Sequence, residues 1–267
     1  MKQVIDKINE ADFVLIGLGE EVDLLPKLQH NSEYQKKLEL IKNSWMVPYI
    51  EKIEIDRRVE EKKEFYHLIA HCLTGKNYFI VSICQDGGMK KAGLDEERIV
   101  EPCGGYGKMQ CSERCSTELY DVPLNILQSI ERYWKEVNVG EKEVQEELGL
   151  LESIREPVCP HCGKPLVFNN VNALKYVEEG YLTQWSIYKK WLQGTMNKKV
   201  CLIEMGVGMK YPTVIRWPFE KIAFYNQKAE LFRVHSRLYQ ITEEIQGKGH
   251  GICQKPEEFM KELSNAF

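Results

Sequence analysis

Two pairs of cysteines constrain this chain of 267 residues more than any other feature. Cys111 and Cys115 are spaced as C-x3-C, and Cys159 and Cys162 as C-x2-C in a Cys-Pro-His-Cys-Gly turn. Each spacing can place two thiolates on one tight turn, and two such turns supply the tetrahedral ligand set of structural zinc. The sequence therefore predicts a zinc site made by these four thiolates. Four thiols with chance spacing are the alternative.

The composition indicates a globular protein that holds reduced cysteines. Charged residues make up 28% and the net charge is -4, so no basic field for nucleic acid exists. No apolar run approaches the length needed to cross a bilayer, and the N-terminus lacks the apolar core of a signal peptide. We therefore expect a cytoplasmic protein without nucleic-acid or membrane partners. Cysteines in the cytoplasm stay reduced, and nine is an odd count, so both points favour a metal site over a disulfide framework.

Apolar runs that end in small or polar residues predict the fold. Four of them read as buried strands, at 13–16, 78–84, 200–205 and 231–235. Helical spacing is expected over 32–73 and 217–227. Strands that alternate with helices and end in glycine turns predict an α/β fold, a Rossmann-like parallel sheet with helices on both faces.

Residues 103–170 interrupt this alternation and hold both cysteine pairs. A helix is expected from Pro123 and an acidic helix over 141–152. A segment with few strong hydrophobic residues and a metal clip fits a small satellite domain. We therefore predict a nucleotide-binding domain formed by 1–102 and 171–267, with an inserted zinc-binding domain at 103–170.

The carboxyl ends of parallel strands are where ligands bind, and three predicted strand ends carry suitable residues. Gly17-Leu18-Gly19 could let backbone amides approach a pyrophosphate, or could form a plain turn. Glu20 and Glu21, which follow, place negative charge where a phosphate would lie.

The other two strand ends leave similar alternatives open. Asp86, after Gln85, could bind a ribose or cap its own turn. Gly206-Val207-Gly208 suits close approach to a ligand or tight packing.

Nucleophilic and histidine-based signatures are weak. No Ser-His-Asp or Cys-His pattern is visible, and the pair His67 and His71 lacks the glutamate of a zinc-protease motif. His161 is expected to be a spectator beside better thiolate ligands. Cys103 could be a nucleophile, although a buried, inert thiol is the simpler interpretation.

The order of these parts resembles the sirtuin family. Residues 86–93 read Asp-Gly-Gly-Met-Lys-Lys-Ala-Gly, similar to the family's Asp-Gly-Leu-His-x-x-Ala-Gly. Residues 99–105 look like the stretch that holds the family's catalytic His-Gly, and the two cysteine pairs match its zinc ligands. The glycines at 206–208 match a Gly-Thr-Ser that holds a ribose and phosphate, and His235 falls near an adenosine-contacting Asn.

The resemblance implies NAD (or ADP-ribose) and zinc as cofactors, and a protein as substrate or partner. It implies Cys103, at the position of the family histidine, and Asp86 as catalytic candidates. The implied cofactor-binding residues are Gly17, Leu18, Gly19, Glu20, Glu21, Gln85, Asp86, Gly206, Val207, Gly208 and His235.

Several departures from the family pattern bear on activity. Ile83 and Cys84 stand where the family has Gln-Asn, Glu21 replaces a phosphate-facing serine, and the Pro-Asp-Phe-Arg segment has no clear match. Thiols ionise near pH 8.5, so Cys103 would replace imidazole poorly at pH 7. The first hypothesis is NAD-dependent ADP-ribosyl transfer, favoured over protein deacylation because one branch of the family transfers with its histidine replaced. The second is an inactive sirtuin fold that binds a nucleotide-like ligand or a protein partner.

Overall fold

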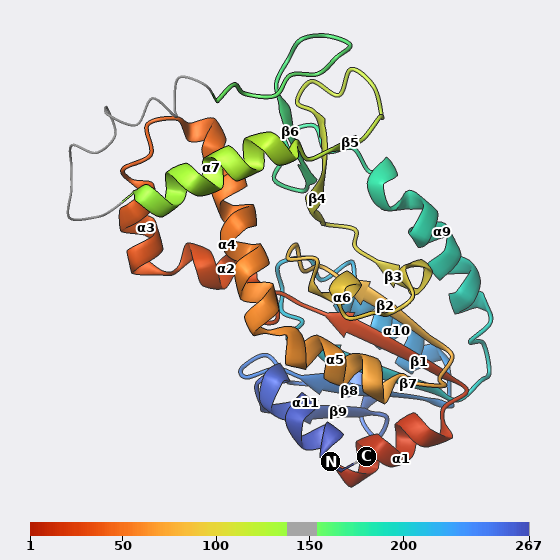
Figure 1. Cartoon of the computed structure of the whole chain (residues 1–267). Coiled ribbons are helices and arrows are strands. Elements are labelled where there is room, and N and C mark those ends of the chain that lie inside the picture. The colour runs from red at the N-terminus through yellow and green to blue at the C-terminus, as the bar shows by residue number, and fades with distance from the viewer. Residues whose placement is uncertain (138–153, 267) are drawn as a thin grey trace. The chain divides into compact units, whose positions relative to one another are not determined.

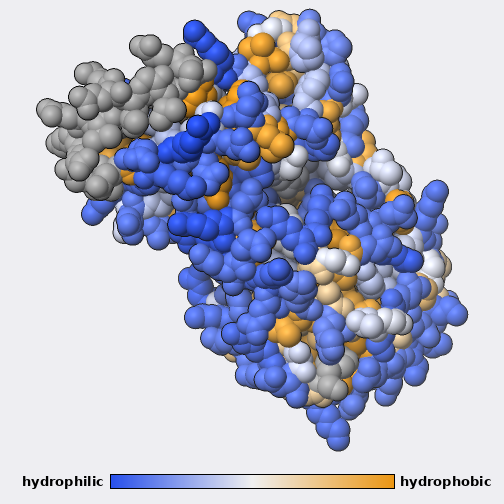
Figure 2. All heavy atoms as spheres, in the orientation of Figure 1, coloured by the Kyte–Doolittle hydropathy of each residue, from blue (hydrophilic) through white to orange (hydrophobic). Residues whose placement is uncertain are grey.

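The computed structural model of the chain describes residues 1–137 and 154–266 (Figure 1). These residues form two compact units. Unit 1 comprises Met1–Asp23, Glu61–Cys103 and Tyr181–Phe267, and unit 2 comprises Leu24–Glu60 and Gly104–Gly180. Hydrophilic side chains cover most of the visible face of each unit (Figure 2). In the part of the chain described, no helix is both long and apolar enough to cross a membrane.

Unit 1 is built on a six-stranded sheet of parallel strands in the order β3-β2-β1-β7-β8-β9. The strands are β1 Phe13–Leu18, β2 Tyr78–Ser82, β3 Ile99–Val100, β7 Val200–Met205, β8 Ala229–Val234 and β9 Gly249–Ile252. The chain extends the sheet from β1 in one direction through β2 and β3, and later in the other direction from β7. The strand order therefore reverses between β1 and β7, which is where such sheets bind ligands. The predicted parallel α/β sheet is confirmed.

Helices cover both faces of this sheet (Figure 1). On one face, α1 Lys2–Glu10, α5 Lys63–Cys72 and α11 Pro256–Ser264 share a core with Ile16 and Ile80. Successive residues of a strand point to opposite faces. Phe79 accordingly meets Tyr188 of α9 Glu179–Gln193, with ring centroids 5.1 Å apart. Gly17 lies against Phe219 of α10 Arg216–Tyr225 on that second face.

The predicted helical region over 32–73 is present in four pieces. They are α3 Ser32–Leu38, the short 3-10 helix η1 Ser44–Met46, α4 Val47–Glu61 and α5. Asn31 caps α3 by accepting a hydrogen bond from the Tyr34 amide at 2.8 Å. Pro48 has no N–H and therefore suits the first turn of α4, where it marks a new helix start. Three further short helices in unit 1 are α6 Gly88–Lys91, η2 Glu96–Arg98 and η3 Glu243–Ile245.

Unit 2 combines helices with a small antiparallel sheet. The sheet has the order β5-β4-β6, from β4 Gly104–Cys111, β5 Tyr120–Asp121 and β6 Leu166–Asn170. Its helices include α2 Leu24–Gln29, α3, α4 and α7 Leu124–Glu136. Helix α7 confirms the helix expected after Pro123, which serves as the residue preceding the first turn. The acidic helix predicted over 141–152 lies outside the described residues.

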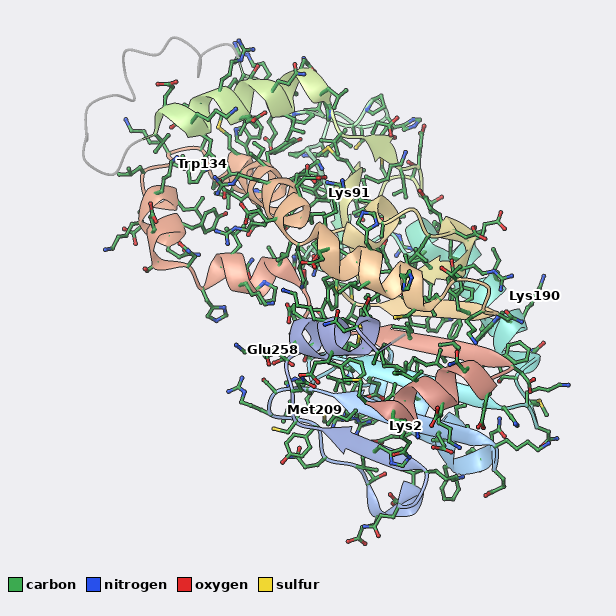
Figure 3. All side chains as sticks on the ribbon, turned by 60° about the horizontal axis from the view of Figure 1, so that its bottom comes forward. Lys2, Lys91, Trp134, Lys190, Met209 and Glu258 are labelled. Atoms are coloured by element: carbon green, nitrogen blue, oxygen red, sulfur yellow. The ribbon has the colours of Figure 1, made fainter. Side chains whose placement is uncertain are left out.

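One core joins the two chain segments of unit 2. Tyr49 and Ile50 of α4 belong to the same buried cluster as Ile130 and Trp134 of α7 (Trp134 is labelled in Figure 3). The Trp134 indole N–H also donates to a Glu54 carboxylate oxygen at 2.9 Å. Residues 24–60, assigned by sequence to the larger domain, therefore pack with 104–180. That 1–102 with 171–267 and 103–170 are separate folding domains stays a prediction.

Candidate functional site

The four predicted zinc ligands lie together in unit 2. The sulfur atoms of Cys111, Cys115, Cys159 and Cys162 all lie within 4.8 Å of one another. Cys111 and Cys162 are 3.4 Å apart, and Cys115 and Cys159 are 3.5 Å apart. A tetrahedral ion with metal–sulfur bonds of ~2.3 Å separates its ligands by roughly 3.8 Å. The donor set and spacing therefore fit one tetrahedral metal ion.

Two tight turns create this cluster. The Gly163 amide donates to the Cys159 carbonyl at 2.9 Å, and Gly163 has a positive φ of 70° that suits glycine. In the other turn, the Arg114 amide donates to the Cys111 carbonyl at 2.9 Å, and Arg114 adopts φ 51°. Each turn brings the two sulfur atoms of a pair to the same side of the backbone.

The pKa is lowered for two of the four thiols, Cys111 and Cys159, and raised for the other two, Cys115 and Cys162. Burial raises the pKa of Cys159, but hydrogen bonds from the amides of His161 and Cys162, together with those from the Cys115 and Cys162 thiols, lower it to about 6. The imidazole of His161 lies 2.8 Å from a carboxylate oxygen of Glu118, which raises the histidine's pKa. His161 is thus engaged outside the four-thiol cluster, as expected for a spectator.

The second group of predicted site residues lies at the carboxyl ends of the unit 1 strands. We call the loops that follow β1, β2, β7 and β8 the strand-end rim; they span 19–23, 83–87, 206–215 and 235–240. The loop after β7 carries Met209, which is labelled in Figure 3. All of the predicted cofactor-binding residues lie on this rim or at the ends of the strands that lead to it.

The glycines of the rim fit closely against the chain itself. A Cβ atom on Gly19 would lie 2.2 Å from the Gly206 carbonyl oxygen and 2.3 Å from the Val207 Cα. A Cβ on Gly17 would lie 2.4 Å from a methyl group of Ile215. Leu18 and Val207 are buried in the unit. Tight packing of backbone between the β1 and β7 loops therefore explains Gly19 without a ligand, and packing against the Ile215 and Phe219 side chains explains Gly17.

Glu20 and Glu21 reach across the rim to backbone amides. The Glu20 carboxylate accepts hydrogen bonds from the amides of Gly208 at 3.1 Å and Lys210 at 3.2 Å. The Glu21 carboxylate accepts from the amide of Ser236 at 3.1 Å. Both acidic side chains thus turn inward over the loops after β7 and β8.

His235 is a neutral acceptor in this arrangement. Its Nδ1 accepts hydrogen bonds from the amides of Arg237 at 3.0 Å and Leu238 at 3.1 Å. Burial lowers the pKa of His235, and the Glu21 carboxylate, 3.2 Å from Nδ1, acts in the opposite direction. The two amide bonds need an unprotonated Nδ1, which agrees with the lowered pKa.

Asp86 is buried and held by its surroundings. One carboxylate oxygen accepts from the Tyr66 hydroxyl at 2.8 Å, and the other accepts from the Gly88 amide at 2.9 Å. A Cβ on Gly88 would lie 2.2 Å from the Tyr66 ring, so the glycine allows this contact. Gln85 beside it is also buried. Asp86 therefore caps its own turn and keeps a fixed carboxylate at the end of β2.

Cys103 lies in an environment that opposes ionisation. Its residue surface is only 2% exposed. Burial raises the pKa of the thiol to about 12; the Lys210 ammonium lowers it, whereas Asp23 and Glu20 add to the increase. The Cys84 thiol is also buried, with its pKa raised mainly by burial, and it donates to the Gly19 carbonyl at 3.4 Å. Both thiols are protonated at neutral pH, so neither is an activated nucleophile.

Sequence reasoning missed two buried arginines that support the rim, Arg216 at the start of α10 and Arg233 in β8. The Arg233 guanidinium donates to both carboxylate oxygens of Glu204, at 2.5 and 3.2 Å, and to the Gln240 carbonyl at 2.8 Å. Arg216 donates to the carbonyls of Val207 at 3.0 Å and Leu238 at 3.1 Å. The available signal was the charged residue inside each of two apolar strands, Glu204 and Arg233.

In chemical terms, the rim offers backbone N–H donors, a fixed carboxylate at Asp86 and the protonated thiol of Cys84. Amides that converge from two loops suit an anion, and a buried carboxylate suits hydroxyl groups. The rim lies beside the strand-order reversal between β1 and β7, where α/β sheets hold nucleotides.

Comparison with known proteins links these features to one fold. No protein-family model matches the chain. The solved structures that resemble it include Sir2Tm bound to a propionylated peptide, with a TM-score of 0.57 and 14% identity. A complex of Sir2 with a p53 peptide and NAD+ also gives a TM-score of 0.57 with 14% identity. Each similarity covers 100% of this chain and 98% of the other.

Two curated proteins are similar in sequence. A "Protein ADP-ribosyltransferase" from Staphylococcus aureus (strain Mu50 / ATCC 700699) is 24% identical over 183 residues, 68% of this chain. A "Probable bifunctional ADP-ribose hydrolase/ADP-ribosyltransferase" from Fusarium oxysporum f. sp. cubense is 24% identical over 163 residues, 60% of this chain. The matched regions span 54% and 26% of these two relatives.

Proposed function

We propose that this chain, which has the sirtuin fold, binds the ADP-ribose part of NAD at the strand-end rim and transfers ADP-ribose to a protein. The observation that carries the proposal is the agreement between two comparisons. The fold is that of sirtuins, one of them in complex with NAD+, and both curated relatives are named for ADP-ribosyl transfer. The position of the rim beside the strand-order reversal supports the same ligand.

Within this proposal, Asp86 acts as a positioning carboxylate for the ribose hydroxyls. Tyr66 and the Gly88 amide fix its two oxygens, so the carboxylate is held in place before a ligand binds. Transfer breaks the bond between the ribose C1′ and the nicotinamide nitrogen, and the electron pair leaves with nicotinamide. The acceptor atom on the protein substrate then bonds to C1′ and loses its proton.

Cys103, which follows β3, is a neutral thiol in this scheme. With its pKa raised to about 12 by burial, it cannot accept a proton at pH 7. The proton that the acceptor loses must therefore go to water or to another group of the substrate protein. ADP-ribosyl transfer is proposed ahead of deacylation because deacylation by sirtuins uses a basic histidine at this position.

We further propose that the four cysteines of unit 2 hold one structural zinc ion and that the protein works in the cytoplasm. Zinc is favoured by four cysteine sulfur atoms that all lie within 4.8 Å of one another. The reducing cytoplasm keeps such thiols free of disulfides.

Release of nicotinamide from NAD tests the proposed activity. The protein is incubated with NAD and a cell extract as a source of acceptor protein, and nicotinamide and ADP-ribosylated protein are both measured. Asp86→Asn should lower both by tenfold or more, whereas Asp121→Asn, whose side chain is 88% exposed, should leave them unchanged. Equal nicotinamide release with and without the protein would exclude the activity.

A specific observation favours a second candidate, an inactive sirtuin fold that binds an ADP-ribose-like ligand. At position 103 a protonated thiol stands where sirtuins have a basic histidine. Glu20 and Glu21 already accept hydrogen bonds from backbone amides of the rim. Calorimetry with ADP-ribose separates the two functions. Binding without nicotinamide release identifies the second candidate.

A further inference from the structure

Three backbone amides of the strand-end rim point at two carboxylates of the same chain. The amides of Gly208 and Lys210 donate to Glu20, and the amide of Ser236 donates to Glu21. The donors come from the loops after β7 and β8, and the acceptors from the loop after β1. Converging amides of this kind form a site for an anion, and here the anion belongs to the protein.

The amides are held in place by groups other than the two glutamates. Buried Arg216 links the carbonyls of Val207 and Leu238, one on each amide-bearing loop. Arg233 fixes the second loop through the carbonyl of Gln240 and is itself paired with buried Glu204. Because these bonds do not involve Glu20 or Glu21, the amide donors should keep their positions when the glutamates are replaced.

The glutamates also lie close against the loops that they contact. A Cβ atom on Gly208 would lie 2.2 Å from a Glu20 carboxylate oxygen, and one on Gly206 would lie 2.8 Å from the Glu21 Cβ. The Glu21 side chain is only 20% exposed. A phosphate could not share these amides with the carboxylates, since both groups carry negative charge and need the same donors.

We propose that Glu20 and Glu21 are specificity-determining residues that occupy an anion site made by the amides of Gly208, Lys210 and Ser236. A ligand that carries phosphate reaches these amides only by displacing the two side chains. The glutamates therefore weaken binding of phosphate-bearing ligands relative to the same site without them. The identity of the natural ligand rests on the proposed function, but the competition for the amides does not.

Two double variants separate the charge of the glutamates from their hydrogen bonds. Glu20→Ser/Glu21→Ser removes both the charge and the reach of the side chains. Glu20→Gln/Glu21→Gln removes the charge but leaves an amide oxygen that can still accept. The matched control is Glu10→Gln/Glu258→Gln, which makes the same charge change at exposed positions of unit 1 (Glu258 is labelled in Figure 3).

Inorganic pyrophosphate is the probe, measured by calorimetry and by the NMR shifts of the Gly208, Lys210 and Ser236 amides. We expect the serine variant to bind pyrophosphate at least tenfold more tightly than the original chain, a gain of about 1.4 kcal/mol. The glutamine variant should lie between them, and the control should match the original chain. Circular dichroism melts verify folding, and the glutamine variant decides the test if the serine variant does not fold.

Equal pyrophosphate affinity in the original chain and in both rim variants would overturn the inference. An equal gain in the control would also overturn it, because net charge alone would then explain the change. Pyrophosphate has no bond to nicotinamide, so this test is independent of activity. Tighter pyrophosphate binding without nicotinamide release from NAD would uphold the inference and reject the proposed enzyme.

Discussion

The guanidinium of Arg233 in β8 donates two hydrogen bonds to the carboxylate of Glu204 in the neighbouring strand β7, and both side chains are 0% exposed. A third partner, Glu220 of α10, lies 2.8 Å from Arg233. An isolated charge in such a place is very costly, so each member depends on the others. Their role is to fix the loop at 235–240 through Gln240.

Replacement of Arg233 by methionine should therefore destabilise unit 1 strongly. Glu204 would lose its buried partner, and we expect the free energy of unfolding to fall by about 3–5 kcal/mol. Urea unfolding followed by circular dichroism measures the loss. Arg237→Met, at an exposed position of the same unit, should change stability by no more than about 0.5 kcal/mol. A loss of similar size in both variants would contradict a special role for the buried pair.

Zinc content should depend on each thiol of the four-cysteine cluster. The original chain should carry about one zinc ion, because four thiolates complete one tetrahedral shell. Cys159→Ser should reduce zinc measured by elemental analysis to a small fraction of that amount and lower the melting temperature of unit 2. Cys253→Ser is the matched control, since Cys253 is exposed and lies in unit 1. Unchanged zinc in Cys159→Ser would rule out the four-thiol site.

Stability should fall as pH rises above about 9 because of buried thiols. Burial raises the pKa of Cys72 to about 11 and of Cys103 and Cys201 to about 12. Thiols of the unfolded chain ionise near pH 8.5, so the unfolded state binds fewer protons than the folded state above that pH. The thiol contribution is complete below about pH 8 and is lost as pH rises toward 12.

The pH effect can be isolated for Cys103 by comparison with Cys103→Ala. We expect the original chain to lose about 1–2 kcal/mol relative to this variant between pH 7.5 and 10. Urea unfolding at several pH values gives the difference directly. A stability difference that stays constant over this range would show that the Cys103 thiol ionises equally in both states.

The hydrogen bond between Tyr66 and Asp86 should contribute to stability and to ligand positioning. Tyr66→Phe removes one donor to a buried carboxylate, and we expect a loss of about 1–3 kcal/mol. Tyr78→Phe removes a hydroxyl that contacts the exposed Asp95 amide at 3.3 Å and should cost less than about 1 kcal/mol. Chemical unfolding of the two variants measures both values. A smaller loss for Tyr66→Phe than for Tyr78→Phe would show that Asp86 does not depend on Tyr66.

Four of the six strands of unit 1 were predictable because burial on both faces gives a mainly apolar run, whereas β3, with two residues, and the glycine-rich β9 give no such run. Phe13–Leu18 and Val200–Met205 confirm two such predictions. The sheet of unit 2 was not predicted, because β4 begins with Gly104-Gly105 and has a further glycine at 107, which strands disfavour. Contacts with Asn169 and Asn170 of the paired strand β6 explain Gly104.

The cysteine cluster was predictable because its ligands come in close pairs along the chain, and the structure brings all four together. The hydrogen bonds that Glu20 and Glu21 make within the rim could not be predicted from the sequence. Sequence placed Glu20 and Glu21 near a phosphate position, but only the fold shows that Gly208, Lys210 and Ser236 donate to them. These partners lie about two hundred residues away along the chain, beyond the reach of any local pattern.

The fit of Gly19 against Gly206 also determines where the protein can be redesigned. No side chain, not even a methyl group, can be added at position 19 without displacing the neighbouring main chain. A mutant library that seeks a new ligand preference should therefore keep both glycines and randomise positions 20, 21, 209 and 237, where side chains already exist. Selection from such a library would show which classes of ligand this fold can bind.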